Sequence, residues 1–117
     1  MCGIVGFIDK SKNKKDTIKK MADLIKHRGP DSDGYYTDDI AGLGFRRLSI
    51  IDLNNGDQPI YNEDHTKLIF FNGEIYNYEE LKKELEGNGH TFTTKADTEV
   101  ILHGYEEYGS KILPKLR

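Results

Sequence analysis

Apolar and polar residues follow one another in an order that predicts alternating strands and helices in the first half of the chain. The run GIVGFI (3–8) predicts a strand that is buried on both faces. Between about 15 and 26, apolar residues recur every three or four positions, which predicts a helix. The segment HRGPDSDG (27–34) is rich in Gly, Pro and Asp and predicts a loop. Strands are expected at 35–37 and 41–50.

The middle of the chain carries one more apolar run and a helix with a clear start signal. KLIFFNGEIYN (67–77) begins as an apolar strand and runs into an Asn-Gly dipeptide. Asn77 as N-cap, with Glu80 three residues later, has the pattern of a capping box. The glycines of GNG (87–89) are expected to end this helix.

The last third predicts a short strand and a third helix. HTFTT (90–94) favours a strand, and Asp97 or Thr98 can cap the helix that follows. Gly104 weakens the expectation that this helix is continuous. The whole order of elements indicates a layered α+β domain.

Composition narrows the class of protein. The chain has 117 residues, a formal net charge of −3 and one cysteine. The charge gives no electrostatic reason to expect nucleic acid or an anionic membrane as partner. A single cysteine cannot form an internal disulfide, and neither a signal peptide nor a membrane span is recognised in the sequence. A cytoplasmic protein is therefore expected.

Cys2 is the first candidate for chemistry. Removal of Met1 would leave an α-amino group on the carbon that bears the thiol. An α-amine with a pKa of about 8 and a thiol with a pKa of about 8.5 both titrate near neutral pH. The amine could therefore act as the base for its own thiol, as in N-terminal nucleophile enzymes. The alternative is a small core residue at the start of a strand.

An acyl-transfer reaction also needs donors for a developing oxyanion. The side-chain amide of Asn72 and the backbone N–H of Gly73 are candidates for this role. The competing interpretation is a β-hairpin turn, because Asn-Gly between apolar runs is a common hairpin signal.

Two charged residues are candidates for binding charged groups of a ligand. Arg47 lies among apolar residues and fits a carboxylate, whereas Arg46 is expected at the surface. Asp97 could bind an ammonium group or cap the third helix. His27, His65, His90 and His103 lack the spacing of metal ligands, so no metal site is expected, although a Cys–His dyad with His27 stays open.

Six segments together resemble the glutaminase domain of class II glutamine amidotransferases, and are most similar to the asparagine synthetase branch. These segments are MCGIVGF, HRGPDSDG, RRLSIIDL, GDQPIYN, NGEIYNYEEL and ADTEVIL. They run in the family's order over almost the whole chain. The resemblance implies an N-terminal nucleophile hydrolase fold, with stacked sheets between helical layers, of which this chain would be an incomplete N-terminal part.

The resemblance also implies a role for each matching residue. Cys2 would attack the side-chain amide of glutamine, and Asn72 with Gly73 would form the oxyanion hole. Arg47 would hold the α-carboxylate of the substrate. The α-ammonium group would be held by Asp97 and oriented by Glu74, and the pocket would be lined by the backbone of Leu48, Ser49, Ile50 and Ile51.

The expected reaction releases ammonia and glutamate. No cofactor is expected in this part, which would comprise residues 1–117 of a longer protein. A synthetase domain in the same chain would use ATP and Mg²⁺ to make asparagine from aspartate, and the parent protein could be a homo-oligomer. Two alternatives stay open: a different ammonia acceptor, or a glutamine-binding or interaction module without catalysis.

Overall fold

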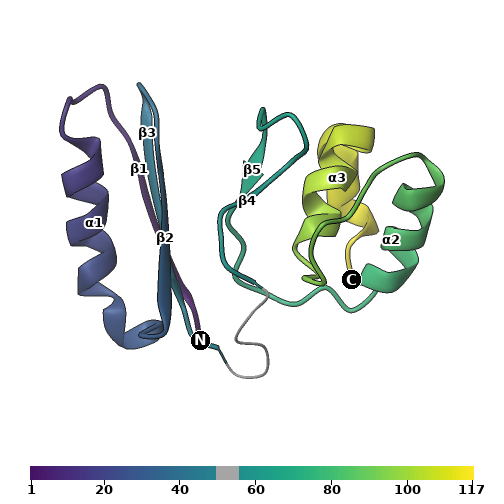
Figure 1. The fold of residues 1–117 in the computed structure, drawn as a ribbon, viewed down its shortest axis with the longest axis horizontal. Helices are drawn as coiled ribbons and strands as arrows, with labels where there is room; N and C mark the ends of the chain where they lie inside the picture. Colours follow the sequence, from purple (N-terminus) through teal and green to yellow (C-terminus); the bar gives the residue numbers. More distant parts are fainter. Residues whose placement is uncertain (50–55) are drawn as a thin grey trace. The chain divides into compact units, whose positions relative to one another are not determined.

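The computed structural model describes residues 1–49 and 56–117, and its elements are of mixed α/β type (Figure 1). The chain forms two compact units. Unit 1 comprises residues 1–59 and 70–72, and unit 2 comprises residues 60–69 and 73–117. Ile50 and Ile51 lie outside the described residues.

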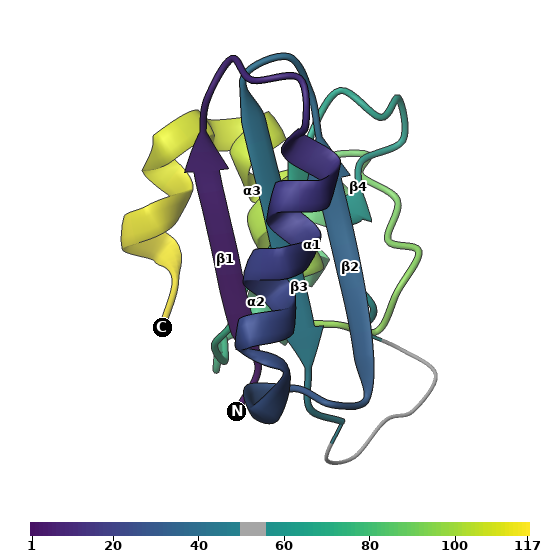
Figure 2. The same ribbon diagram turned by 90° about the vertical axis from the view of Figure 1, so that its left-hand side faces the viewer.

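Unit 1 is a three-stranded antiparallel sheet with a helix on one face (Figure 2). The strands lie in the order β1-β3-β2. Strand β3 pairs with both neighbours, so that Arg46 lies opposite Gly3 on one side and Asp33 on the other. The elements of this unit are β1 (Gly3–Ile8), α1 (Lys14–Leu24), the 3₁₀ helix η1 (Lys26–Arg28), β2 (Ser32–Thr37) and β3 (Ala41–Arg47).

A glycine in the central strand lets α1 pack closely on the sheet. Ile18 and Ala22 of α1 are fully buried. A Cβ at Gly44 would lie 3.2 Å from the Ile18 side chain and 3.5 Å from the Ala22 Cβ. Because a larger residue at position 44 would push the helix away, this glycine sets the distance between helix and strand.

Strand β1 differs from its prediction. Its exposure alternates, and Ile4 and Ile8 are 44% and 86% exposed. The expectation of a strand buried on both faces was therefore wrong. β1 is an edge strand of its sheet, and α1 covers only one face of that sheet. The predicted loop at 27–34 was also only partly right, since it contains the end of η1 and the beginning of β2.

Arg46 is buried, contrary to the surface position expected for it. Only 6% of the residue is exposed. Its Nε donates to the Ala22 carbonyl oxygen at 3.1 Å, and its guanidinium pairs with Asp33 at 3.2 Å and with Asp23. A cation at the C-terminal end of α1 also suits the helix dipole. Arg46 thus ties the end of α1 to strands β2 and β3.

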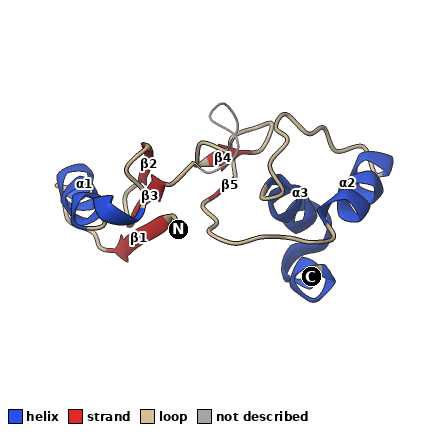
Figure 3. Ribbon diagram, turned by 90° about the horizontal axis from the view of Figure 1, so that it is seen from below, coloured by secondary structure: helices blue, strands red, loops and turns tan. Residues whose placement is uncertain are grey.

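Unit 2 consists of a two-stranded ribbon and three helical segments, of which α2 and α3 pack together (Figure 3). Its core includes Leu81 and Leu85 from α2 and Val100, Leu102 and Ile112 from the segments that follow. The elements are β4 (Ile60–Tyr61), β5 (Leu68–Ile69), α2 (Tyr78–Gly87), α3 (Glu99–Tyr108) and the 3₁₀ helix η2 (Gly109–Lys115).

Gly104 does not interrupt α3. A Cβ at this position would lie 2.4 Å from the Cδ1 atom of Ile112. The glycine therefore leaves room for η2 to pack against α3. The sequence pattern could not distinguish this close approach from a weak point in the helix.

The helix starts and the N-cap residues Asn77 and Thr98 were predicted correctly, but the expected side-chain capping hydrogen bonds do not form. Asn77 occupies the N-cap position of α2 without a side-chain capping hydrogen bond, so no capping box with Glu80 forms. The Asn77 side chain instead accepts from the Arg117 backbone N–H at 2.9 Å and donates to the Lys115 carbonyl oxygen at 2.8 Å. Thr98 is the N-cap of α3, also without a side-chain bond.

Two predicted strands are much shorter than expected or do not form. In the segment 67–77 only Leu68–Ile69 is a strand, and 90–94 has no regular structure. The Asn-Gly dipeptide at 72–73 is not a hairpin turn, because β5 pairs with the preceding strand β4. Among the helices that the structure describes, none combines the length and the apolar character needed to cross a membrane.

Candidate active site

The thiol of Cys2 lies beside the backbone at the end of β3. The backbone N–H of Leu48 points at the Cys2 sulfur, with an N···S distance of 3.4 Å. The sulfur also lies 3.8 Å from the Leu48 carbonyl oxygen, and the residue is only partly buried. Met1 is 77% exposed, so an aminopeptidase could reach it.

The side chain of Asn72 reaches the same residue. Its Nδ2 donates to the Cys2 carbonyl oxygen at 3.0 Å, and the Nε of Arg28 donates to that oxygen at 3.4 Å. Two predicted catalytic residues 70 positions apart are therefore in direct contact. His27 has no hydrogen bond with Cys2 among the described residues, whereas its neighbour Arg28 does.

Gln58 fixes the segment that carries Asn72. Its side-chain oxygen accepts from the Phe71 backbone N–H at 2.6 Å, and its Nε2 donates to the Phe71 carbonyl oxygen at 2.9 Å. The amide thus satisfies both backbone groups of the residue before Asn72. Sequence reasoning missed this role. The only signal was a Gln within a turn-rich segment, which gives no indication that its side chain is buried.

Gly34 allows the Gln58 segment to cross β2. A Cβ at Gly34 would lie 1.6 Å from the Gln58 carbonyl oxygen. No side chain fits at this distance without a backbone shift. The glycine is therefore part of the support for the Cys2–Asn72 contact.

Arg47 is buried at the end of β3, as its neighbourhood in the sequence suggested. The residue is 8% exposed, and its Nη1 pairs with the Asp57 carboxylate at 3.1 Å. Asp57 also accepts from the Ser32 hydroxyl at 3.1 Å, and its side chain is 76% exposed. A carboxylate therefore already lies against this guanidinium.

Leu48 and Ser49 continue from Arg47 along the same segment. Besides the Leu48 contact with sulfur, the Ser49 backbone N–H donates to Asp31 at 2.7 Å. The Asp31 backbone N–H in turn donates to the Arg47 carbonyl oxygen at 3.1 Å. The loop before β2 thus holds the segment next to Cys2. The remaining two predicted pocket residues, Ile50 and Ile51, lie outside the described residues.

The other predicted site residues, Gly73, Glu74 and Asp97, belong to unit 2. Gly73 and Glu74 are exposed, and Asp97 is partly buried. The Asp97 carboxylate accepts from the Ile75 backbone N–H at 2.7 Å. Asp97 is therefore not a side-chain cap of α3, and it lies next to the segment that carries Glu74.

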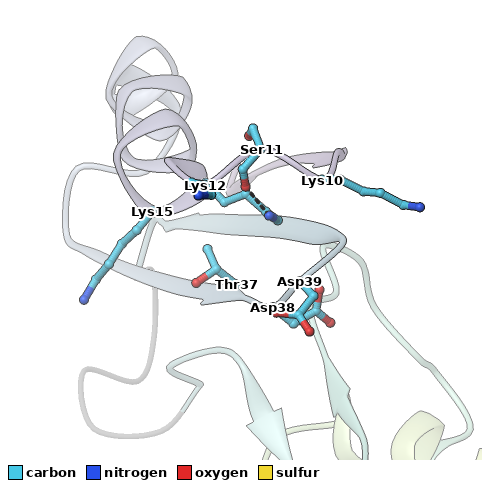
Figure 4. Close-up of a pocket in the computed structure, with 8 residues that line it drawn as sticks. Lys10, Ser11, Lys12, Lys15, Thr37, Asp38 and Asp39 are labelled. Carbon is cyan, nitrogen blue, oxygen red and sulfur yellow. Dashed lines mark hydrogen bonds between the residues drawn. The ribbon is translucent and has the colours of Figure 1, made fainter.

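A shallow hollow lies in unit 1 between the β1–α1 loop and the β2–β3 turn (Figure 4). Four lysines and two aspartates line it, so its net charge is positive. The antiparallel register places it at the Ile8 and Ala41 end of the strands, while Cys2 precedes the Gly3 and Arg46 end. Six residues of strand separate the two, about 20 Å. The hollow is not part of the Cys2 site.

Comparison with known proteins assigns the family. A family model described as a glutamine amidotransferase domain matches residues 1–117. Glutamine-hydrolysing asparagine synthetase 1 of Bacillus subtilis (strain 168) is 53% identical over 122 residues, with 100% of this chain and 19% of the relative covered. The corresponding enzyme 2 of that organism is 48% identical, with 93% of this chain and 15% of the relative covered.

A plant relative gives a similar result. The glutamine-hydrolysing asparagine synthetase of Zea mays is 45% identical over 119 residues, with 99% of this chain and 20% of the relative covered. The chain thus spans about a fifth or less of the length of these curated relatives. Since the family model covers the whole chain, this protein belongs to the glutamine amidotransferase domain family.

Proposed function

We propose that this chain is the N-terminal part of a glutaminase domain in which Cys2 hydrolyses glutamine to glutamate and ammonia. The observation that carries the proposal is the environment of the Cys2 sulfur, with the Leu48 N–H at 3.4 Å and the Asn72 amide on the same residue. The names of the relatives, which are glutamine-hydrolysing enzymes, support the substrate.

The chemistry would proceed through a thioester. After removal of Met1, the α-amine accepts the thiol proton, and the thiolate attacks the substrate amide carbon. The amine then returns the proton to the departing nitrogen, which leaves as ammonia. Water attacks the thioester, releases glutamate and restores the thiol. In each step the proton moves only among Cys2, the substrate and water, so no other acid or base is needed.

Asn72 and Gly73 would stabilise the oxyanion that forms in both halves of the reaction. A side-chain amide carries two N–H groups, and one of those of Asn72 is held by the Cys2 carbonyl oxygen. The second N–H is the one assigned to the oxyanion, together with the Gly73 backbone N–H. Removing one such donor typically lowers the rate roughly 10²- to 10³-fold.

Charged residues would recognise the amino-acid end of glutamine. Arg47 would bind the α-carboxylate, since its buried guanidinium already pairs with a carboxylate. Asp97 would bind the α-ammonium group, and Glu74 would orient it. The pocket wall would be the backbone of Leu48, Ser49, Ile50 and Ile51.

The proposal for the whole protein goes further. The complete domain would have the N-terminal nucleophile hydrolase fold, and ammonia would pass to a synthetase domain that makes asparagine from aspartate. ATP and Mg²⁺ would act in that domain, and no step in this chain passes through them. The homo-oligomer and the cytoplasmic location stay predictions, as does the alternative of a different ammonia acceptor.

Glutamate release from glutamine by the native full-length protein tests the proposal. Cys2→Ala is expected to abolish release, and an electrophilic glutamine analogue is expected to add one adduct to the wild-type sulfur, located by peptide mass spectrometry. The intact mass of the active preparation should lack Met1. Normal turnover in Cys2→Ala, or an active preparation that retains Met1, would contradict the mechanism.

A glutamine-binding module without catalysis makes a different prediction. Calorimetry on the full-length protein would then show glutamine binding, equal in wild type and Cys2→Ala, with no glutamate released. Loss of binding in Arg47→Ala is expected under either interpretation, so it tests the carboxylate assignment alone.

A further inference from the structure

A cluster of histidines and carboxylates lies in unit 2, and the glutaminase mechanism does not use it. His103 and Glu106 share one face of α3 at i, i+3 spacing, and His90 approaches them from the segment that follows α2. One ligand atom from each of these three side chains lies within 4.8 Å of the other two. His103 is 1% exposed, and the side chains of His90 and Glu106 are 15% and 16% exposed.

The spacing of these atoms matches the ligand set of a tetrahedral metal ion. Oε2 of Glu106 lies 3.0 Å from Nδ1 of His103 and 3.3 Å from Nδ1 of His90. Zinc with bonds of about 2.0–2.1 Å to nitrogen and oxygen has ligands separated by about 3.3–3.4 Å along the tetrahedron's edges. Small adjustments of these side chains would therefore make room for an ion between them.

Each histidine is also held at its other nitrogen, as metal-ligating histidines are. Nε2 of His103 lies 3.1 Å from the Glu99 carboxylate, and Nε2 of His90 lies 2.7 Å from the Glu107 carboxylate. Such outer carboxylates fix the tautomer that leaves Nδ1 for the metal and increase its basicity. This repeated arrangement distinguishes the cluster from a simple patch of acidic side chains.

Glu106 supplies the third proposed metal ligand, and a neighbouring group can supply the fourth. The Asn62 side-chain amide donates to Oε1 of Glu106, which leaves Oε2 directed at the two histidines. Oε1 of Glu63 lies 3.7 Å from Nδ1 of His103, and its side chain is 50% exposed. A water molecule or Glu63 could therefore supply the fourth ligand.

We propose that His90, His103 and Glu106 form a binding site for a zinc-class divalent cation. Two imidazole nitrogens favour Zn²⁺, Co²⁺ or Ni²⁺ over Mg²⁺ and Ca²⁺, which prefer oxygen ligands. The sequence indicated no metal site, because a separation of thirteen residues between the histidines has no recognised spacing. The pairing of His90 with α3 brings the three ligands together.

Zinc titration of the tag-free, chelator-treated chain, in competition with a chromophoric chelator at about pH 7.5, tests the proposal. Wild type should bind one equivalent of Zn²⁺, and Co²⁺ should give the visible absorption of a tetrahedral site. His90→Ala and Glu106→Gln should weaken binding by more than the roughly 10- to 100-fold expected for the outer-carboxylate variant Glu107→Gln. Mg²⁺ and Ca²⁺ should not compete.

Two matched variants locate the ion. His27→Ala removes an exposed histidine from unit 1, and Cys2→Ser removes the only thiol. Both should bind Zn²⁺ like wild type. Binding that is lost in Cys2→Ser, or that survives unchanged in both His90→Ala and Glu106→Gln, would overturn the proposal, as would wild type that binds no zinc. His90 and Glu106 are chosen over the fully buried His103, and circular dichroism of each variant checks that it is folded.

Discussion

Replacement of Arg46 tests how unit 1 holds its helix on its sheet. The Arg46 side chain is 7% exposed, and its guanidinium makes three polar contacts, with Ala22, Asp23 and Asp33. We expect Arg46→Met to lose all three and Arg46→Lys to retain only part of them. Lysine keeps the charge but not the planar fork that reaches several acceptors at once.

The exposure of the partners sets the size of the effect. Removing one member of a fully buried ion pair costs about 3–5 kcal/mol, because the remaining charge is stranded. Here the Asp23 and Asp33 side chains are 56% and 46% exposed, so water solvates them once the arginine is gone. Each pair should then contribute close to the exposed value of about 0.2–1 kcal/mol, and the bond to the carbonyl oxygen about 1 kcal/mol. We expect a total loss of about 1.5–3 kcal/mol for Arg46→Met and about half of that for Arg46→Lys.

Amide hydrogen exchange of β3, measured by mass spectrometry in increasing urea, reports this stability separately from unit 2. Lys20→Met, which removes an exposed cation from α1, is the matched control and should change stability by less than about 0.5 kcal/mol. Equal stability of wild type and Arg46→Met would refute the reasoning. A loss of 5 kcal/mol would also refute it, because it would mean that the two carboxylates cannot reach water.

Three further predictions concern single sites. Glu99→Gln should lower the free energy of urea unfolding by about 3–5 kcal/mol, more than Arg46→Met, because the buried carboxylate pairs with the buried His103 and accepts hydrogen bonds from Thr93 and Thr94. The exposed Glu86→Gln is the control. Burial raises the pKa of Glu99, but hydrogen bonds from His103 and from Thr93 and Thr94 lower it to about 2. With chelator present, this carboxylate should therefore stabilise the fold above about pH 4.5 by on the order of 3 kcal/mol, and this stabilisation should be lost as the pH falls toward 2. The measurement is the free energy of unfolding as a function of pH. No such loss in wild type, or the same loss in Glu99→Gln, would contradict the prediction. Gly34→Ala should displace the Gln58 carbonyl and lower glutaminase kcat without abolishing folding; unchanged kcat would show that this crossing does not position Asn72.

Local chemistry explains which elements the sequence predicted well. The three main helices lie within a few residues of their predicted ranges, because apolar spacing and breakers such as the glycines at 87 and 89 act over one or two turns. The predicted side-chain capping bonds do not form because Asn77 and Asp97 make hydrogen bonds with other backbone groups of unit 2. These groups belong to Lys115, Arg117 and Ile75. A side chain near a helix start caps it only when no tertiary partner competes for its hydrogen bonds.

The sequence by itself determined the family, the candidate nucleophile Cys2 and the partner Asn72, since these depend on residue identity in ordered motifs. Only the tertiary structure decided the contacts of the two adjacent arginines. Arg46 joins α1 to the sheet, while Arg47 faces Asp57. Neighbouring residues on a strand point to opposite faces, and what covers each face is set by the rest of the fold. The same holds for the support of Asn72 by Gln58 and for the meeting of His90 with His103, because both join residues that are distant along the chain.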